Sequence, residues 1–356
     1  MTAFTLKLQE ADARERLRAF WDGSSLGRPA LGITVAVPGD PGPLFDDPTL
    51  SQKALDLLPE WHAWNIRSQV GRLQYKAETM PGFAVGWGSF LVTLAVLAGG
   101  DYTYHDSAWI LPIPDLYDHP LPAFNPEHPI AQQLTACYQR VMAEVGDAGF
   151  VTPPLMMDGL STLSMFRGPD QLCLDMIEQP ATVKAWTAAL TTMYIDIYEY
   201  YYQLIGAGYS LCFFGPFAEG RSEGVQCDFA VNLSPAMYKE FVYPDLRRVT
   251  DYFDAALYHL DGTCQMRFLE HLRAMPKLNG IQWNPETTAG SPADWLDALQ
   301  EIRRQRFSLM IWTSPEEAVA ITRALGPDGL FLQLPTFTSE AAAEAAIRDI
   351  EYVCGK

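Results

Sequence analysis

The chain contains the stretch Ala255-Ala256-Leu257-Tyr258-His259-Leu260-Asp261-Gly262, which has the pattern of a buried β-strand ending at a glycine. Successive side chains of a strand alternate between its two faces, so we expect His259 and Asp261 on one face. Tyr258 and Leu260 would point to the other. A histidine and a carboxylate that converge at a strand end can bind a metal ion or move a proton. They can equally cap the strand by bonding to the next loop, and this short pattern alone does not separate the two roles.

Apolar runs that resemble strands alternate with helical patterns from about residue 126 onward. The predicted strands are Phe150–Met157, Ser210–Phe214, Ala256–Leu260, Gly280–Trp283, Leu309–Trp312 and Gly329–Leu334. The predicted helices are Pro129–Val145, Pro169–Ile205, Pro235–Phe253, Met266–Met275, Pro292–Arg304 and Pro315–Leu325. Proline suits the first helical turn, where a backbone N–H has no partner to lose. The strand-then-helix order predicts an α/β fold with a parallel sheet, and the number of units favours a single (β/α)8 barrel of the TIM type.

The first 125 residues are less regular. They contain one predicted strand, Ala30–Val37, between predicted helices at Ala11–Trp21 and Leu50–Leu73. Residues 76–125 are rich in Pro, Gly and aromatic side chains, which favours a cover over a binding pocket, lined by Trp87 and Trp109. We therefore predict one domain, in which residues 1–125 form an extension plus the first barrel strand and residues 126–356 form the rest of the barrel.

Composition limits the partners of this chain. Its 356 residues carry a net charge of −18 without any stretch rich in Lys or Arg, which disfavours nucleic acid and anionic membranes. The first residues lack a signal-peptide pattern, and the apolar run Phe90–Ala98 is much shorter than the roughly 20 residues of a membrane span. The six cysteines are scattered without a Cys-x-x-Cys pair, which indicates reduced thiols. We predict a cytoplasmic protein that acts on a small molecule.

Several motifs resemble those of the uroporphyrinogen decarboxylase (URO-D) superfamily, which also contains zinc-dependent methyltransferases that serve corrinoid proteins. The resemblance rests on Asp228, on the helix start Ser234-Pro235 and on the strand end His259-Leu260-Asp261-Gly262. Phe166-Arg167-Gly168-Pro169 and Arg28-Pro29-Ala30-Leu31 also look like the central region of that superfamily and the start of its first strand. The resemblance implies a (β/α)8 barrel whose pocket lies at the C-terminal ends of the strands.

The chain departs from the motifs of both well-known activities. Uroporphyrinogen decarboxylases carry several arginines near the N-terminus, whereas the comparable residues 73–81 contain one Lys beside a Glu. The methyltransferases hold zinc with a His-x-Cys pair and a later Cys. Here His259 matches the histidine, Asp261 stands in place of the first cysteine, and residues 331–335 contain no cysteine. The resemblance implies a metal site of His259 and Asp261 that Cys227, Asp228 or Cys264 would complete, with harder ligands that suit oxygen-containing substrates.

Other candidate residues follow predicted strands, where barrel enzymes place their loops. Glu219 is a candidate catalytic residue, and the candidates for substrate binding are Arg221, Gln282, Trp283, Asp158, Arg167 and Trp87. Each also has a structural reading, such as an exposed ion pair or an aromatic ring that packs at the rim.

Three functions follow from these patterns. The first is a methyltransferase in which His259 is a metal ligand or proton donor, Asp261 its partner or second ligand, and Asp228 an acid/base or third ligand. Its corrinoid would arrive on a partner protein, since the chain has no Asp-x-His-x-x-Gly motif. The second is a decarboxylase without a cofactor, and the third is a barrel that only binds a ligand. The resemblance also implies a possible homodimer.

Overall fold

The structure is a computed structural model that describes residues 10–38, 51–70, 72–85, 92–105, 107–212, 215–286 and 288–355. Its helices are α1 Glu10–Trp21, α2 Gln52–Asp56, α3 Pro59–Val70, α4 Thr93–Leu97, α5 Pro129–Val145, α6 Gly159–Arg167, α7 Pro169–Glu178, α8 Pro180–Ile205, α9 Pro235–Met237, α10 Tyr243–Tyr252, α11 Leu269–Arg273, α12 Leu296–Arg304, α13 Pro315–Leu325 and α14 Glu340–Val353. Its strands are β1 Ala30–Ala36, β2 Leu73–Ala77, β3 Gly82–Ala84, β4 Tyr102–Tyr104, β5 Ala108–Ile110, β6 Phe150–Thr152, β7 Tyr209–Leu211, β8 Phe217–Glu219, β9 Ser222–Gln226, β10 Ala255–Asp261, β11 Gly280–Asn284, β12 Ser308–Trp312 and β13 Leu330–Gln333.

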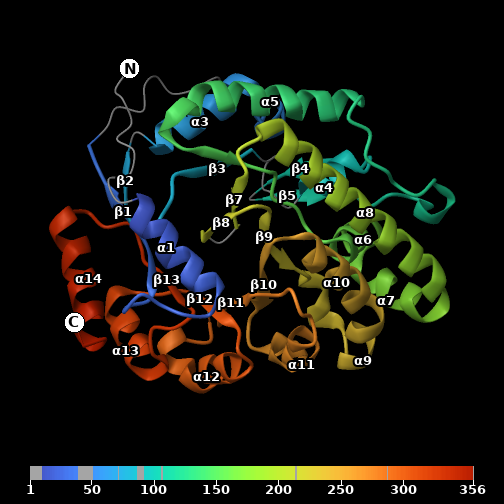
Figure 1. Cartoon of the computed structure of the whole chain (residues 1–356). Coiled ribbons are helices and arrows are strands. Elements are labelled where there is room, and N and C mark those ends of the chain that lie inside the picture. The colour runs from blue at the N-terminus through green and yellow to red at the C-terminus, as the bar shows by residue number, and fades with distance from the viewer. Residues whose placement is uncertain are drawn as a thin grey trace.

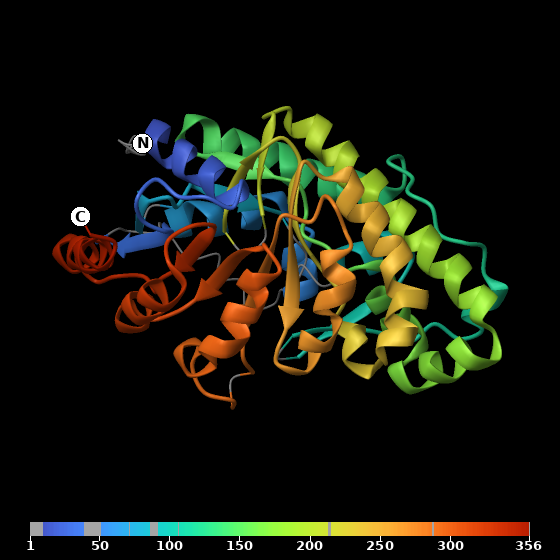
Figure 2. The same cartoon turned by 60° about the horizontal axis from the view of Figure 1, so that its bottom comes forward.

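A mostly parallel sheet of seven strands organises the fold, with the order β2-β1-β13-β12-β11-β10-β9. All neighbours in it are parallel except the antiparallel pair β1 and β2. Strand β1 therefore joins the start of the chain to its last strand, β13. Figures 1 and 2 show the helices on the outside of these strands. The predicted α/β fold with a parallel sheet is confirmed.

The two faces of the sheet belong to different clusters of buried residues. One face packs against the surrounding helices in a large core that includes Tyr258 and Leu260. The other face contributes Leu257, Met310 and Phe331 to a smaller inner core, which α1 completes with side chains such as Phe20. The hydroxyl of Ser308, the first residue of β12, donates to the backbone oxygen of Phe20. Helix α1 therefore lies at the N-terminal ends of the strands and leaves their C-terminal ends available for a site.

Several predicted elements have the predicted bounds because their first turns are well capped. Helices α5 and α13 begin and end as the sequence predicts. Ser314 caps α13 in a reciprocal arrangement with Glu317, whose carboxylate accepts from the Ser314 backbone N–H. Ser234 likewise accepts from the backbone N–H of Met237 at the start of α9.

Prolines account for several corrections to the predicted elements. The helix predicted at Pro169–Ile205 is two helices, α7 and α8, which separate at Gln179 because Pro180 cannot continue a helix. The helix predicted at Leu50–Leu73 is likewise divided into α2 and α3 at Pro59. The strand predicted at Phe150–Met157 ends at Thr152, since the next two residues are prolines without a ladder N–H.

Other differences arise where the sequence pattern is weak. The helix predicted at Pro235–Phe253 consists of α9, a π-helical turn at Tyr238–Val242 and α10, which begins just before Pro244. Strands β8 and β9 and helices α6 and α14 have no predicted counterpart. Phe213 and Phe214, at the end of a predicted strand, lie outside the described residues. None of the described helices has both the length and the apolar character needed to cross a membrane.

Candidate metal centre

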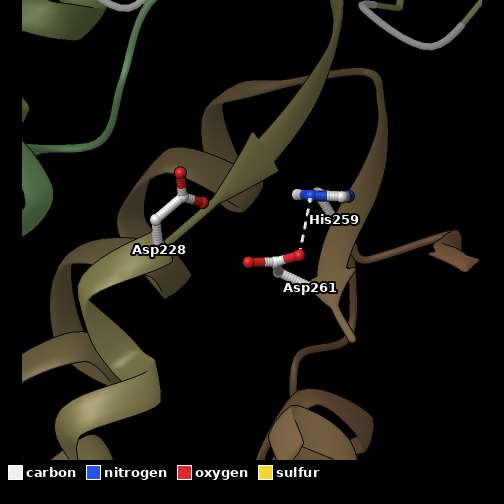
Figure 3. A group of neighbouring side chains, drawn as sticks. All are labelled: Asp228, His259 and Asp261. Atoms are coloured by element: carbon white, nitrogen blue, oxygen red, sulfur yellow. Dashed lines mark ion pairs between the residues drawn. The ribbon is translucent and has the colours of Figure 1, made fainter. Parts of the chain in front are cut away.

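Three side chains that can bind a metal meet at the C-terminal end of the sheet: Asp228, His259 and Asp261 (Figure 3). Each offers a ligand atom that lies within 4.8 Å of the other two. His259 and Asp261 lie on the inner face of β10 with Leu257, two residues earlier, whose side chain belongs to the inner core. Tyr258 packs on the opposite face, so the predicted orientation of the two reactive side chains is confirmed.

Asp228 reaches the group from the segment that follows β9. The neighbouring Phe229 is buried, and its backbone N–H donates to the Ser161 hydroxyl over 3.2 Å, which holds the first turn after the strand. Asp228 Oδ1 is buried and has no hydrogen-bond partner among the residues that the structure describes. Burial raises the pKa of Asp228, nearby His259 opposes that shift, and the Asp261 carboxylate adds to it. A buried carboxylate oxygen without a donor is costly, and a bound cation would satisfy it.

The spacing within the group suits a shared cation. His259 Nε2 and Asp261 Oδ1 are 3.8 Å apart, which is longer than a direct hydrogen bond. Zinc binds nitrogen and oxygen ligands at about 2.0–2.2 Å, so two ligands of a tetrahedral site lie roughly 3.4 Å apart. The side chain of His259 is 20% exposed and that of Asp261 is 53% exposed, so the group opens to solvent on the Asp261 side. Three protein ligands with one open position are the usual composition of a catalytic zinc site.

The donor atoms of the group limit which metal ions can bind there. One imidazole and two carboxylates form a ligand set without thiolate, which accepts zinc and harder divalent ions such as manganese. Cys227 does not face the group: its side chain is buried, with Sγ 3.9 Å from the Ser161 hydroxyl, and burial raises the pKa of this thiol. Cys264 is exposed in the short helix that follows β10. Among the described residues, neither cysteine belongs to the group of candidate ligands.

Gln282 and Trp283 occupy opposite faces of β11. Gln282 is fully buried beside the group, and its side-chain oxygen is hydrogen-bonded to His259 Nδ1. Trp283 packs in the large core on the helix side, where its indole N–H donates to the backbone oxygen of Gly262 over 2.9 Å. This bond supports the turn after Asp261, in which Gly262 adopts a positive φ of 71°.

Asp158 is the N-cap residue of α6 and lies outside the group of candidate metal ligands. Its Oδ1 accepts from the backbone N–H groups of Leu160 and Ser161, each over 3.0 Å. It also lines a cavity of about 30 Å³ together with Cys227, Thr191 and other residues of α8, β9 and α10. Burial raises the pKa of Asp158 to about 6, although the bonds from Ser161 oppose this shift.

Glu219 and Arg221 lie at the opposite end of the strands. Strand β8 runs antiparallel to β7 and carries the chain back, so Glu219 and Arg221 precede β9 instead of following a strand of the parallel sheet. Glu219 pairs with Arg18 of α1. Arg221 forms two hydrogen bonds to Glu199, of 2.8 and 2.9 Å, and its guanidinium lies 4.8 Å from the ring centre of Tyr202. Both residues hold elements together at the end that α1 covers.

The remaining candidates also have structural partners or fall outside the description. Arg167 pairs with Asp175 over 2.6 Å and lies over the ring of Tyr117, where it joins α6 to α7. Trp109 is 58% exposed on β5. Trp87 lies outside the described residues.

Two residues of the site region were missed by the sequence reasoning. Asn284 ends β11 and bonds to the backbone of Trp312, which ends β12 and is 43% exposed. Trp312 follows the inward-facing Met310 by two residues, so strand alternation places its ring on the same face of the sheet. Both Asn284 and Trp312 lie at or just after the C-terminal end of a predicted parallel strand, and this position is the sequence signal that indicates them.

The fold and the residue group together define an α/β protein with a histidine–carboxylate cluster at the C-terminal end of a mostly parallel sheet. No protein-family model and no curated protein matches the chain. Among solved structures, a methyltransferase from Methanosarcina mazei superposes with a TM-score of 0.61. The match covers 96% of this chain and 98% of the other at 12% sequence identity, so it shows a shared fold over nearly the whole length.

Proposed function

We propose that this protein is a metal-dependent enzyme of the URO-D superfamily that transfers methyl groups, with a divalent cation such as zinc held by Asp228, His259 and Asp261. The observation that supports the metal most directly is that ligand atoms of Asp228, His259 and Asp261 lie within 4.8 Å of one another, while the buried Asp228 Oδ1 has no hydrogen-bond partner among the described residues. The shared fold with a methyltransferase supports the reaction class.

The proposal includes a closed (β/α)8 barrel. Strand β3 pairs with β6, and β7 contacts both β6 and β9, so these short strands lie next to the edge of the sheet at β9. Phe150 of β6 belongs to the same inner core as Leu257 of β10 and Ala30 of β1. Strands that surround one inner core in this way support closure, and barrel enzymes place their sites at the C-terminal ends of the strands.

We assign a separate role to each residue of the site. A cation held by Asp228, His259 and Asp261 would supply Lewis acidity to a substrate oxygen. Gln282 holds the imidazole of His259 in place, and the half-buried Asp228 would contribute a carboxylate ligand. Asp261 remains partly exposed and meets the incoming substrate. Carboxylate ligands in place of thiolates suit an oxygen-containing substrate better than a thiol, and the corrinoid that exchanges the methyl group would be carried by a separate protein.

Metal content tests the first half of this proposal. Purified protein dialysed against zinc should retain about one equivalent per chain, and His259→Ala or Asp228→Asn should weaken zinc binding by about 100-fold or more. Glu270→Gln, an exposed carboxylate change on α11, is the matched control and should bind zinc like the wild type. Less than about a tenth of an equivalent in the wild type would overturn the metal site.

Methyl transfer is tested with methylcobalamin as the donor. Zinc-loaded protein should speed transfer of its methyl group to the oxygen of a small hydroxyl or carboxylate compound, which leaves cob(I)alamin and, from a hydroxyl, releases a proton. The visible absorbance of the corrinoid follows this reaction. Asp261→Asn should slow this reaction, whereas the Glu270→Gln control should not.

The second candidate function is a decarboxylase without a metal. The raised pKa of Asp228 favours it, because a carboxyl that keeps its proton at higher pH can donate that proton to a carbanion-like intermediate. Absence of bound zinc together with carbon dioxide release that depends on Asp228 would favour this function over methyl transfer.

A further inference from the structure

A chain of hydrogen bonds leads from the backbone of β12 to the imidazole of His259. The side chain of Asn284 bonds to both backbone groups of Trp312: Nδ2 donates to the oxygen over 2.9 Å, and Oδ1 accepts from the N–H over 3.3 Å. Gln282 Nε2 donates to Asn284 Oδ1 over 2.8 Å. Gln282 Oε1 in turn is bonded to His259 Nδ1. The four groups therefore form one continuous relay across β12, β11 and β10.

The direction of this relay is set at its Trp312 end. A backbone N–H can only donate and a backbone oxygen can only accept, so the amide of Asn284 has one satisfactory orientation. Its oxygen then requires a donor from Gln282, which turns the Gln282 oxygen toward His259. An amide oxygen only accepts, so the proton of a neutral imidazole must lie on Nδ1.

Register and burial make this arrangement specific. His259 pairs with Gln282 and Asp261 pairs with Asn284 in the parallel register of β10 and β11, which brings each relay residue beside a residue of the cluster. Gln282 is fully buried, so water does not compete for its amide. A reversed amide at either position would place two donors or two acceptors against each other.

We infer that Gln282 and Asn284 are positioning residues that hold His259 in the Nδ1–H tautomer and so direct its Nε2 lone pair toward Asp261 and Asp228. This replaces substrate binding as the role of Gln282. The statement that this tautomer favours metal binding rests on the proposed function. The tautomer itself is expected in the metal-free protein and does not depend on that function. Partners of this kind behind a metal-ligating histidine fix its ring and raise its basicity.

Nitrogen NMR of the metal-free protein tests the tautomer directly. The sample is labelled with ¹⁵N-histidine and measured at a pH where imidazoles are neutral, with the His259 signals identified by their loss in His259→Ala. We expect a protonated Nδ1 and an unprotonated Nε2 in the wild type. A protonated Nε2 would overturn the inference.

Variants test the two positioning residues. Gln282→Leu removes the acceptor and should shift His259 toward the Nε2–H tautomer. Gln282→Glu loses the donor to Asn284 Oδ1 but keeps an acceptor opposite Nδ1, so Nδ1 should stay protonated. Asn284→Leu frees the Gln282 amide to rotate and should give a mixture of the Nδ1–H and Nε2–H tautomers of His259. Gln132→Leu on the exposed face of α5 is the matched control and should change nothing. Unchanged His259 signals in a folded Gln282→Leu protein would overturn the role of Gln282, and unchanged signals in Asn284→Leu would overturn that of Asn284.

Zinc titration by calorimetry extends the test to the metal. Gln282→Leu should weaken zinc binding by about 10–100-fold, with the Gln132→Leu control unaffected. Equal zinc affinity of Gln282→Leu and the wild type would overturn the link between tautomer and metal. If the wild type shows the Nδ1–H tautomer but binds no zinc, the proposed function fails while the relay stands.

Discussion

Replacement of Asp158 by asparagine should stabilise the protein at neutral and alkaline pH. Asp158 Oδ2 is buried and has no hydrogen-bond partner within the described part of the chain, while Oδ1 caps α6 through two backbone N–H groups. Asparagine is as good a helix cap as aspartate and carries no charge, so the capping bonds survive and the buried charge disappears.

The size of the effect follows from the pKa. Burial raises the pKa of Asp158 from 3.8 to about 6, and one unit corresponds to 1.36 kcal/mol, so ionisation costs the folded state up to about 3 kcal/mol. Below pH 3.8 the carboxyl is protonated in both the folded and unfolded states and costs nothing. The cost grows as the pH rises from about 4 to 6 and is fully present above that range.

Urea unfolding followed by circular dichroism at several pH values from 5 to 8 measures this difference. Asp158→Asn should exceed the wild type in free energy of unfolding by up to about 3 kcal/mol at pH 8, and the gain should shrink toward pH 5. A gain that is the same at pH 5 and pH 8, or a variant less stable than the wild type at pH 8, would refute this account of the buried carboxyl.

Three further predictions concern other parts of the structure. The pKa of Asp175 is shifted in the opposite direction to that of Asp158. Burial alone would raise the pKa of Asp175, but hydrogen bonds from Arg167 and other donors lower it to about 2. Asp175→Asn should therefore destabilise the protein above pH 4 by about 2 kcal/mol, a loss that vanishes as the pH falls toward 2, measured by the same unfolding curves. Glu78→Ala should cost about 3–5 kcal/mol in urea unfolding, because it removes the buried carboxylate that holds Arg28 over 2.7 and 3.0 Å and leaves that arginine only the more exposed Glu351 at 3.4 Å. A loss below about 1 kcal/mol would contradict this. Gly262→Ala should weaken zinc binding in calorimetry, since alanine is strained at a φ of 71° in the turn after Asp261, whereas Gly355→Ala, near the end of the chain, should leave it unchanged.

Much of the fold is readable from local patterns. Prolines and serine caps locate the starts of α9 and α13, and the apolar run before His259 locates β10. The pattern is weak where inward-facing positions are polar: β9 reads Ser-Glu-Gly-Val-Gln, yet all five residues are buried. An irregular polar pattern of this kind does not distinguish a buried strand from a loop, so β9 and the Asp228 that follows it lacked a predicted place in the sheet.

Sequence alone determined that His259 and Asp261 point the same way, because alternation within one strand is a local property of the backbone. It also determined that they lie where a strand ends. Only the tertiary structure decided which other side chains join them. The antiparallel pairing of β8 with β7 places Glu219 and Arg221 at the far end of the strands. The alternation of β9 turns Cys227 away from the group, and the register of β10 on β11 sets Gln282 against His259. Strand order and register arise from contacts between residues far apart in the chain, and these contacts decide which of the reactive groups meet.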